Sequence, residues 1–277
     1  VRELGASASS NGGMPDFDGV RKKYIVLLSQ HTKRHTILYF SKFTQPDPRP
    51  IGPLLSLAFG DVHGLMDVVY GLKGSALDLV LHSPGGSPEA AEAVVNYLRS
   101  KFSDVRVIVP HMAMSAATMI ACAADRIVLA KHSSLGPIDP QVVINTALGP
   151  MAVPAFAVLD QFAMAQQDCA DPKKLAAWMP ILPQYGPAFL MQCRNAISLS
   201  KALVGDWLAK YMLKADPNAG QKSKQIAEWL TDHSNFHSHA RSLDASVCGG
   251  KGLVIDPLAV QAWADSLGTD QPLPLPR

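Results

Sequence analysis

The stretch that decides the fold lies between residues 79 and 141. It reads LVLHSPGGSPEAAEAVV over residues 79–95 and VRVIVPHMAMSAATMIACAADRIVLAKHSSLGPIDPQ over residues 105–141. Its apolar runs at 79–81, 105–109 and 126–130 have the length of buried strands, and turn residues follow the first two. A helical pattern separates each run from the next. This alternation predicts an α/β fold with a mainly parallel sheet and right-handed βαβ connections.

The turn after residues 79–81 carries a pair of glycines. Gly85 and Gly86 follow the apolar run, and Ser87 and Pro88 then occupy the N-cap and the first position of a predicted helix that ends near Lys101. Glycines between a strand and a helix start allow unusual backbone angles and leave bare N–H groups for a ligand. The turn is therefore a candidate binding loop, although a tight turn that simply needs glycine explains the same residues.

A single serine opens the second helix. Ser115 follows the strand at 105–109, and residues 116–124 after it form an almost wholly apolar helix of small residues, which predicts a buried helix. At a helix start, the macrodipole and the free N–H groups favour a negative charge such as the oxyanion of acyl transfer. Ser115 is therefore the candidate nucleophile, and the plain alternative is an N-cap serine with no chemistry.

Three motifs in this stretch together resemble a known family. SPGG (83–86), MSAAT (114–118) and GPIDPQ (136–141) are similar to the serine dehydrogenase proteinase (SDH proteinase) family, which is related to signal peptide peptidase A and to the proteolytic subunit of the Clp protease. The resemblance implies a Clp/crotonase-like fold of stacked βαβ units with a C-terminal helical region. It also implies a serine endopeptidase that acts through an acyl-enzyme without a cofactor, takes peptides or proteins as substrates and assembles into a homo-oligomer.

The resemblance also assigns an oxyanion hole. In the relatives, the main-chain N–H of the SPGG turn and that of the residue after the serine hold the oxyanion of the tetrahedral intermediate. The matching residues here are Gly85, Gly86 and Ala116. These three backbone positions are therefore expected to face the same point as the Ser115 hydroxyl.

The general base is less well defined by the sequence. In the Clp subunit it is a histidine after the second strand, where this chain offers only Asp139, which could orient a base or cap its loop. Signal peptide peptidases use a lysine, which serves as a base when burial lowers its pKa. Lys201, among apolar residues of a predicted long helix, is the first candidate, although the family often has its lysine near position 195, which is Asn195 here. His239 in FHSHARSL is the alternative, because imidazole titrates near neutral pH.

The composition argues against several other functions. The 277 residues carry a formal net charge of +2, which gives no electrostatic case for nucleic acid. The histidines and cysteines show no metal-ligand spacing, so no metal site is predicted, and the scattered cysteines fit reduced thiols in the cytoplasm. No apolar run reaches transmembrane length and no signal peptide opens the sequence, so no membrane anchor is predicted in this chain.

The chain order predicts a single domain over residues 21–269. A Gly/Ser-rich segment over residues 1–20 is expected to be mobile, and a Pro-rich tail over residues 270–277 is expected to be loose. Within the domain, residues 24–28 fit a strand or a short helix, 36–40 a strand and 64–72 an amphipathic helix. The interrupted apolar stretch 142–158 is expected to form substrate-binding or subunit-packing surface. Further helices are predicted at 160–167, 188–213, 223–230 and 256–268.

Two other functions remain open at this point. A crotonase-type acyl-CoA enzyme would stabilise a thioester enolate with the same two backbone N–H groups, would contain a coenzyme A pocket and would not need Ser115. A scaffold that has kept the fold but lost its base would act by binding, and would not react with serine-directed probes. The absence of a histidine from residues 135–141, the segment that matches the one carrying the base in the Clp subunit, favours this scaffold.

Overall fold

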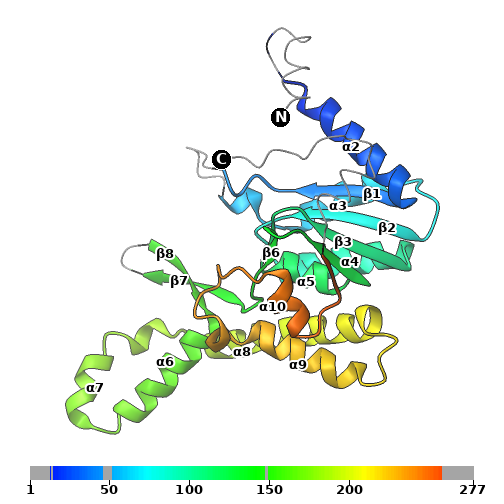
Figure 1. The fold of residues 1–277 in the computed structure, drawn as a ribbon. Helices are drawn as coiled ribbons and strands as arrows, with labels where there is room; N and C mark the ends of the chain where they lie inside the picture. The colour runs from blue at the N-terminus through cyan, green and yellow to red at the C-terminus, as the bar shows by residue number, and fades with distance from the viewer. Residues whose placement is uncertain (1–12, 14, 46–51, 147–148, 258–277) are drawn as a thin grey trace.

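A five-stranded parallel sheet forms the centre of the protein (Figure 1). The computed structural model describes residues 13, 15–45, 52–146 and 149–257. The strands lie in the order β1-β2-β3-β5-β9. They span His35–Phe40 (β1), Ala76–His82 (β2), Asp104–Val109 (β3), Arg126–Leu129 (β5) and Ile255–Pro257 (β9). The predicted α/β class with a mainly parallel sheet is therefore confirmed.

Three helices make the crossovers between neighbouring strands. Helix α3 (Phe59–Val69) lies between β1 and β2, α4 (Pro88–Lys101) between β2 and β3, and α5 (Ala116–Cys122) between β3 and β5. Ser87 caps α4 as predicted, because its side chain accepts from the Ala90 N–H at 3.1 Å. Every residue of α5 is buried, as its small apolar residues predict.

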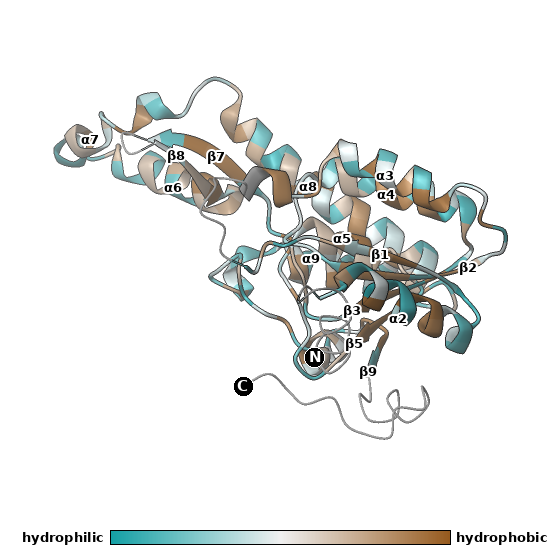
Figure 2. Ribbon diagram, turned by 90° about the horizontal axis from the view of Figure 1, so that it is seen from above, coloured by the Kyte–Doolittle hydropathy of each residue, from teal (hydrophilic) through white to brown (hydrophobic). Residues whose placement is uncertain are grey.

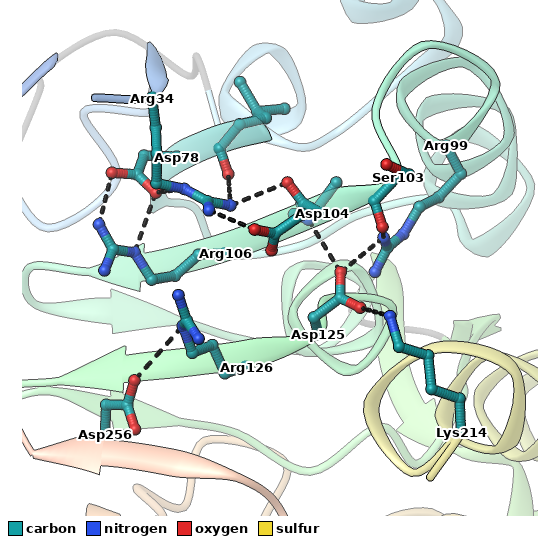
Figure 3. Close-up of polar contacts among 12 residues, drawn as sticks. Arg34, Asp78, Arg99, Ser103, Asp104, Arg106, Asp125, Arg126, Lys214 and Asp256 are labelled. Atoms are coloured by element: carbon teal, nitrogen blue, oxygen red, sulfur yellow. Dashed lines mark hydrogen bonds and ion pairs between the residues drawn. The ribbon is translucent and has the colours of Figure 1, made fainter. Parts of the chain in front are cut away.

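Charged side chains tie the strands to one another and to the helices around them (Figure 3). The fully buried carboxylate of Asp78 lies 2.7 Å from Nε of Arg34 and 2.6 Å from Nη2 of Arg106. Asp125 similarly accepts from Arg99 at 2.8 Å and from Lys214 at 2.6 Å. Each carboxylate is thus shared by two cations from different elements, which compensates for its burial.

The segment after residue 140 leaves the sheet and forms an arm. It consists of a hairpin, β7 (Gln141–Thr146) and β8 (Gly149–Pro154), followed by α6 (Ala155–Asp168) and α7 (Pro172–Trp178). Figures 1 and 2 both show the arm projecting from the sheet. A small separate core, built around Ala155, Val158 and Cys193, joins the arm to the helix that follows it. The helix predicted at 160–167 is present as part of α6, whereas the hairpin was not predicted.

Three further helices follow the arm. Helix α8 (Phe189–Trp207) continues into a π-helical turn (Leu208–Met212), so the helix predicted over 188–213 is present but changes its hydrogen bonding near its end. It packs against α6 in the arm and against α5 and α9 (Ala219–Thr231) in the body, so it joins the two parts. A short helix, α10 (Ala245–Gly250), precedes β9.

The N-terminal part of the described chain is helical. Helix α2 (Phe17–Thr32) begins after Asp16, whose side chain caps it. Residues 17–20, which were expected to be mobile, form its first turn. Residues 24–28, for which a strand or a short helix was expected, lie in the middle of this helix. Residues 256 and 257 belong to β9, and the rest of the helix predicted at 256–268 lies outside the described residues, as does the tail. In the part of the chain that the structure describes, no helix combines the length and apolar character needed to span a membrane.

Candidate active site

The glycine turn between β2 and α4 has a backbone that excludes side chains. Gly85 and Gly86 have φ values of 89° and 154°, in the region that favours glycine. A β-carbon on Gly85 would lie 2.5 Å from the carbonyl oxygen of Met114, and one on Gly86 would overlap that of Leu57. Leu57 also holds the turn from outside, because its N–H donates to the Gly85 carbonyl at 2.7 Å. The turn therefore needs both glycines, whatever it binds.

Ser115 lies in a strained turn directly before α5. Its φ of 51° and ψ of −122° are unusual for any residue other than glycine, and such a conformation costs about 1–3 kcal/mol. The short strand β4 (Met112–Ala113), paired with β6 (Ser134–Leu135), fixes one end of this turn, and α5 fixes the other. The Ser115 side chain makes no capping hydrogen bond to the helix. The alternative of a simple N-cap serine therefore does not describe this residue.

The two turns meet at the carboxyl ends of β2 and β3. A β-carbon on Gly85 would lie 2.8 Å from Cβ of Ser115 and 2.7 Å from the amide nitrogen of Ala116. Ser83 links the turns, because its N–H donates to the Met112 carbonyl at 3.1 Å and its carbonyl accepts from the Met114 N–H at 3.0 Å. In open α/β sheets, ligands bind beyond the carboxyl ends of the strands, so the turns converge at the expected edge.

At this junction, the backbone N–H groups of Gly86, Ser115 and Ala116 have no acceptor among the described residues, whereas the N–H of Gly85 donates to Oγ of Ser83 at 3.1 Å. Ala116 is the first residue of α5, so its N–H is one of those that every helix leaves without an internal partner. Of these three groups, Gly86 and Ala116 are the ones that the family resemblance assigns to an oxyanion hole, while Gly85 allows the two turns to approach closely.

A cavity of about 370 Å³ opens where the turns meet. Ser115, Gly85, Gly86 and His239 line it, together with apolar side chains that include Met119, Ile138 and Leu199. The volume falls in the range of small-ligand sites, which are mostly apolar with a few polar groups that orient the ligand. The structure thus brings Ser115, the glycine turn and one of the two predicted bases to a single cavity.

Asp139 is fully buried and contacts two histidines. Its Oδ1 lies 2.7 Å from Nδ1 of His239, and its Oδ2 lies 2.8 Å from Nδ1 of His233. A neutral imidazole that donates from Nδ1 to a carboxylate keeps Nε2 as an acceptor. The contact between Nδ1 of His239 and Asp139 is thus the one that, in a neutral imidazole, leaves Nε2 available to a serine hydroxyl, and Asp139 is placed to orient the ring.

Backbone pairing brings these two segments together from distant parts of the chain. Leu135 and Leu243 exchange hydrogen bonds at 3.0 and 2.9 Å, and the Ile138 N–H donates to the Leu230 carbonyl at 2.9 Å. His239 lies between the two anchor points of its own segment. The sequence pointed to His239 but not to His233, because nothing in the spacing of DHSNFHSHA distinguishes one histidine from another.

Lys201, the first base predicted from the sequence, lies elsewhere. Its Nζ pairs with Glu228 at 3.0 Å, its side chain is 44% exposed, and it lines a different cavity together with Trp229 and Asn235. Its neighbour Ser200 is buried and lines the Ser115 cavity. Because successive residues of a helix point about 100° apart, the register of α8 that directs Ser200 into the site directs Lys201 away from it.

The family expected from the three motifs is found by comparison with known proteins. The family model described as ClpP-like SDH-type serine proteinase matches residues 65–175. The resemblance is therefore confirmed over a stretch that contains the glycine turn, Ser115 and Asp139. The match ends before α8, so it includes neither Lys201 nor the two histidines.

Two curated proteins and several solved structures are also similar to this chain. Two proteins of Methanocaldococcus jannaschii, both described only as uncharacterized, are 31% and 28% identical over 60% and 59% of this chain. These alignments cover 49% and 47% of the relatives, so the chain spans about half the length of the curated relatives that it matches.

Among solved structures, a mutant of the 1510-N membrane-bound stomatin-specific protease has 15% identity and a TM-score of 0.44, covering 76% of this chain and 79% of that chain. ClpP1 from Listeria monocytogenes has 14% identity and a TM-score of 0.43, covering 84% of this chain and 97% of that chain.

Proposed function

We propose that this protein is a serine endopeptidase in which Ser115 is the nucleophile, His239 the general base and Asp139 the residue that orients His239. The observation that carries the proposal is the cavity that Ser115, the glycine turn and His239 line together. The family match over residues 65–175 supports the same activity. Lys201, paired with Glu228 outside this cavity, has no role in the proposed mechanism.

The proposed reaction uses each group in turn. The Ser115 hydroxyl attacks the carbonyl carbon of the peptide bond while Nε2 of His239 takes its proton. The oxyanion that forms accepts hydrogen bonds from the N–H groups of Gly86 and Ala116. His239 then gives the proton to the departing amine, which leaves an acyl-enzyme on Ser115. Water, deprotonated by His239, hydrolyses the ester and restores the serine.

The setting of the enzyme is also part of the proposal. Apolar walls at Met119, Ile138 and Leu199 favour an apolar side chain next to the cleaved bond of a peptide or protein substrate. All four cysteines are free thiols, which supports a reducing compartment such as the cytoplasm. The family resemblance supports a homo-oligomer, for which sedimentation equilibrium should give a mass well above the 29.7 kDa of one chain.

The test is hydrolysis of an unfolded protein labelled with a fluorophore. We expect the wild-type protein to release labelled peptides and Ser115→Ala to fall to background. Ser100→Ala removes an exposed hydroxyl on α4 and should keep full activity. Undiminished hydrolysis by Ser115→Ala would contradict the proposal. Turnover of an acyl-CoA by both the wild type and Ser115→Ala would favour the crotonase-type alternative, and inactivity of the wild type in both assays would favour the scaffold.

A further inference from the structure

A second histidine shares the carboxylate that His239 uses. Oδ1 of Asp139 accepts from His239, whereas Oδ2 lies 2.8 Å from Nδ1 of His233 and accepts from Nε2 of Gln141 at 3.0 Å. Among the described residues, these three side chains are the only hydrogen-bond donors to the Asp139 carboxylate. The two oxygens are therefore divided, one for His239 and the other for His233 and Gln141.

A buried carboxylate depends on this second set of partners. Asp139 has no exposed surface, and within the described part of the chain no arginine or lysine forms an ion pair with it. A buried charge without hydrogen bonds is costly, so Oδ2 needs donors of its own. A carboxylate also turns about its Cβ–Cγ bond, so a single contact with His239 does not fix its orientation. His233 and Gln141 supply the remaining restraint.

His233 is held by its own backbone, unlike a histidine on an unrestrained loop. It begins a 3-10 turn (His233–Asn235) just after α9, and the Asp232 side chain caps that turn by accepting from the Ser234 N–H at 2.9 Å. The His233 carbonyl accepts from the N–H groups of Phe236 and His237 at 3.0 and 2.8 Å. The ring is thus presented to Oδ2 of Asp139 from a fixed point.

We propose that His233 is a positioning residue for the catalytic histidine. By donating to Oδ2, it holds the Asp139 carboxylate so that Oδ1 remains directed at Nδ1 of His239, and this keeps Nε2 of His239 unprotonated and available to Ser115. The proposal rests on the proposed peptidase function. His233 itself contacts neither the serine nor the substrate; it acts only through Asp139. Hydrogen-bond partners that orient the ligands of metal sites change activity by about 10–100-fold when they are removed, and we expect an effect of the same order here.

Steady-state kinetics give the first test. His233→Leu removes the donor, so kcat should fall by about 10–100-fold with KM nearly unchanged. His233→Asn places an amide nitrogen near the position of Nδ1 and should recover most of that loss. His237→Asn is the matched control, since it changes an exposed histidine of the same loop, at a positive φ that asparagine tolerates, and should leave kcat unchanged. Equal kcat values for wild type and His233→Leu would overturn the proposal even if Ser115→Ala is inactive.

Nitrogen NMR of histidine-labelled protein gives a test that needs no peptidase activity. The His239 ring should carry its proton on Nδ1 in the wild type and in His233→Asn, and should become a mixture of tautomers in His233→Leu. Should Ser115→Ala still hydrolyse peptides, the proposed function fails, and these spectra still decide whether His233 positions His239. A His239 signal that is identical in the wild type and in His233→Leu would refute the positioning role on its own.

Discussion

At the scale of single residues, the site depends on two backbone conformations that few side chains tolerate. Ser115 adopts a positive φ although it is not glycine, and Gly85 lies so close to the serine turn that a β-carbon would overlap it. In this conformation the Ser115 side chain caps no N–H group of α5, as a serine at a helix start commonly does. Ser115 lines the cavity instead.

The strain at Ser115 predicts an unusual stability difference. Ser115→Gly and Ser115→Ala both remove the hydroxyl, but only glycine adopts a φ of 51° without penalty. Glycine usually costs stability because it loses more chain entropy on folding, by about 0.5–1 kcal/mol. We expect the relief of strain to exceed this, so that Ser115→Gly is about 1 kcal/mol more stable than Ser115→Ala in urea unfolding. A more stable alanine variant would mean that the turn is not strained.

The close approach of Gly85 predicts a second effect. Gly85→Ala should lose about 1–3 kcal/mol more stability than Gly149→Ala, and should also lose hydrolytic activity, because the new methyl group would push the two turns apart. Gly149 is the matched control, since its φ is 110° but a β-carbon there would meet nothing within 4 Å. Thermal unfolding and peptide hydrolysis of both variants would measure this. Similar losses in the two variants would show that φ alone matters.

At this scale, the sequence is most informative about candidate residues whose context is local. Ser115, Gly85 and Gly86 stand beside helix starts, and that context is visible in the sequence itself. The sequence does not decide between Lys201 and His239 as the base, because Asp139 and His239 meet only through pairing of distant segments around Leu135 and Leu243. His233 also reaches the Asp139 carboxylate only in the folded chain, since the two residues lie far apart in the sequence.

At the scale of elements, the sheet and its crossover helices follow from periodicity and caps. The runs before Gly85 and Ser115 became β2 and β3, and the Ser87–Pro88 pair started α4 as predicted. The β7–β8 hairpin was missed because Gly149 and the prolines at 150 and 154 indicate breaks. In the structure they lie at the ends of β8, where a strand tolerates them. Helix α2 was hard to recognise because it buries no residue, so its sequence has no clear apolar stripe.

The charged contacts that join the elements predict a pH dependence of stability. Burial alone would raise the pKa of Asp125, but hydrogen bonds from Lys214, the Val105 N–H and Arg99 outweigh it and hold the pKa below its ordinary value of 3.8. A carboxyl group whose pKa is lower in the folded protein stabilises it above the unfolded pKa, and this contribution is lost as the pH falls through the folded pKa. We therefore expect the free energy of unfolding to decrease with falling pH below about 4.

Asp125→Asn provides the comparison for this pH dependence. The variant should be less stable than the wild type at pH 7, and the difference between the two should shrink as the pH is lowered from about 4 toward 2, because the wild-type carboxyl group becomes protonated. Urea unfolding across this range measures it. A stability difference that stays constant with pH would show that Asp125 does not contribute through its charge.

At the scale of the whole molecule, the fold places three distant parts of the chain around one cavity. The glycine turn comes from the β2–α4 connection, the serine from the start of α5, and His239 from the segment after α9 (Figure 1). Helix α8 closes the cavity with Leu199 and Ser200 and also carries the arm, so the site lies where body and arm join. A family match can identify the first two parts, but only the complete fold supplies the third.

The most direct test of this arrangement is intact mass spectrometry after reaction with a fluorophosphonate, which phosphonylates an activated serine. The account predicts one added group on the wild type and on Lys201→Ala, none on Ser115→Ala, and labelling at least about 100-fold slower on His239→Ala, because the base is gone. Labelling of Ser115→Ala would contradict the account. So would a result in which Lys201→Ala is no longer labelled while His239→Ala is labelled as fast as the wild type.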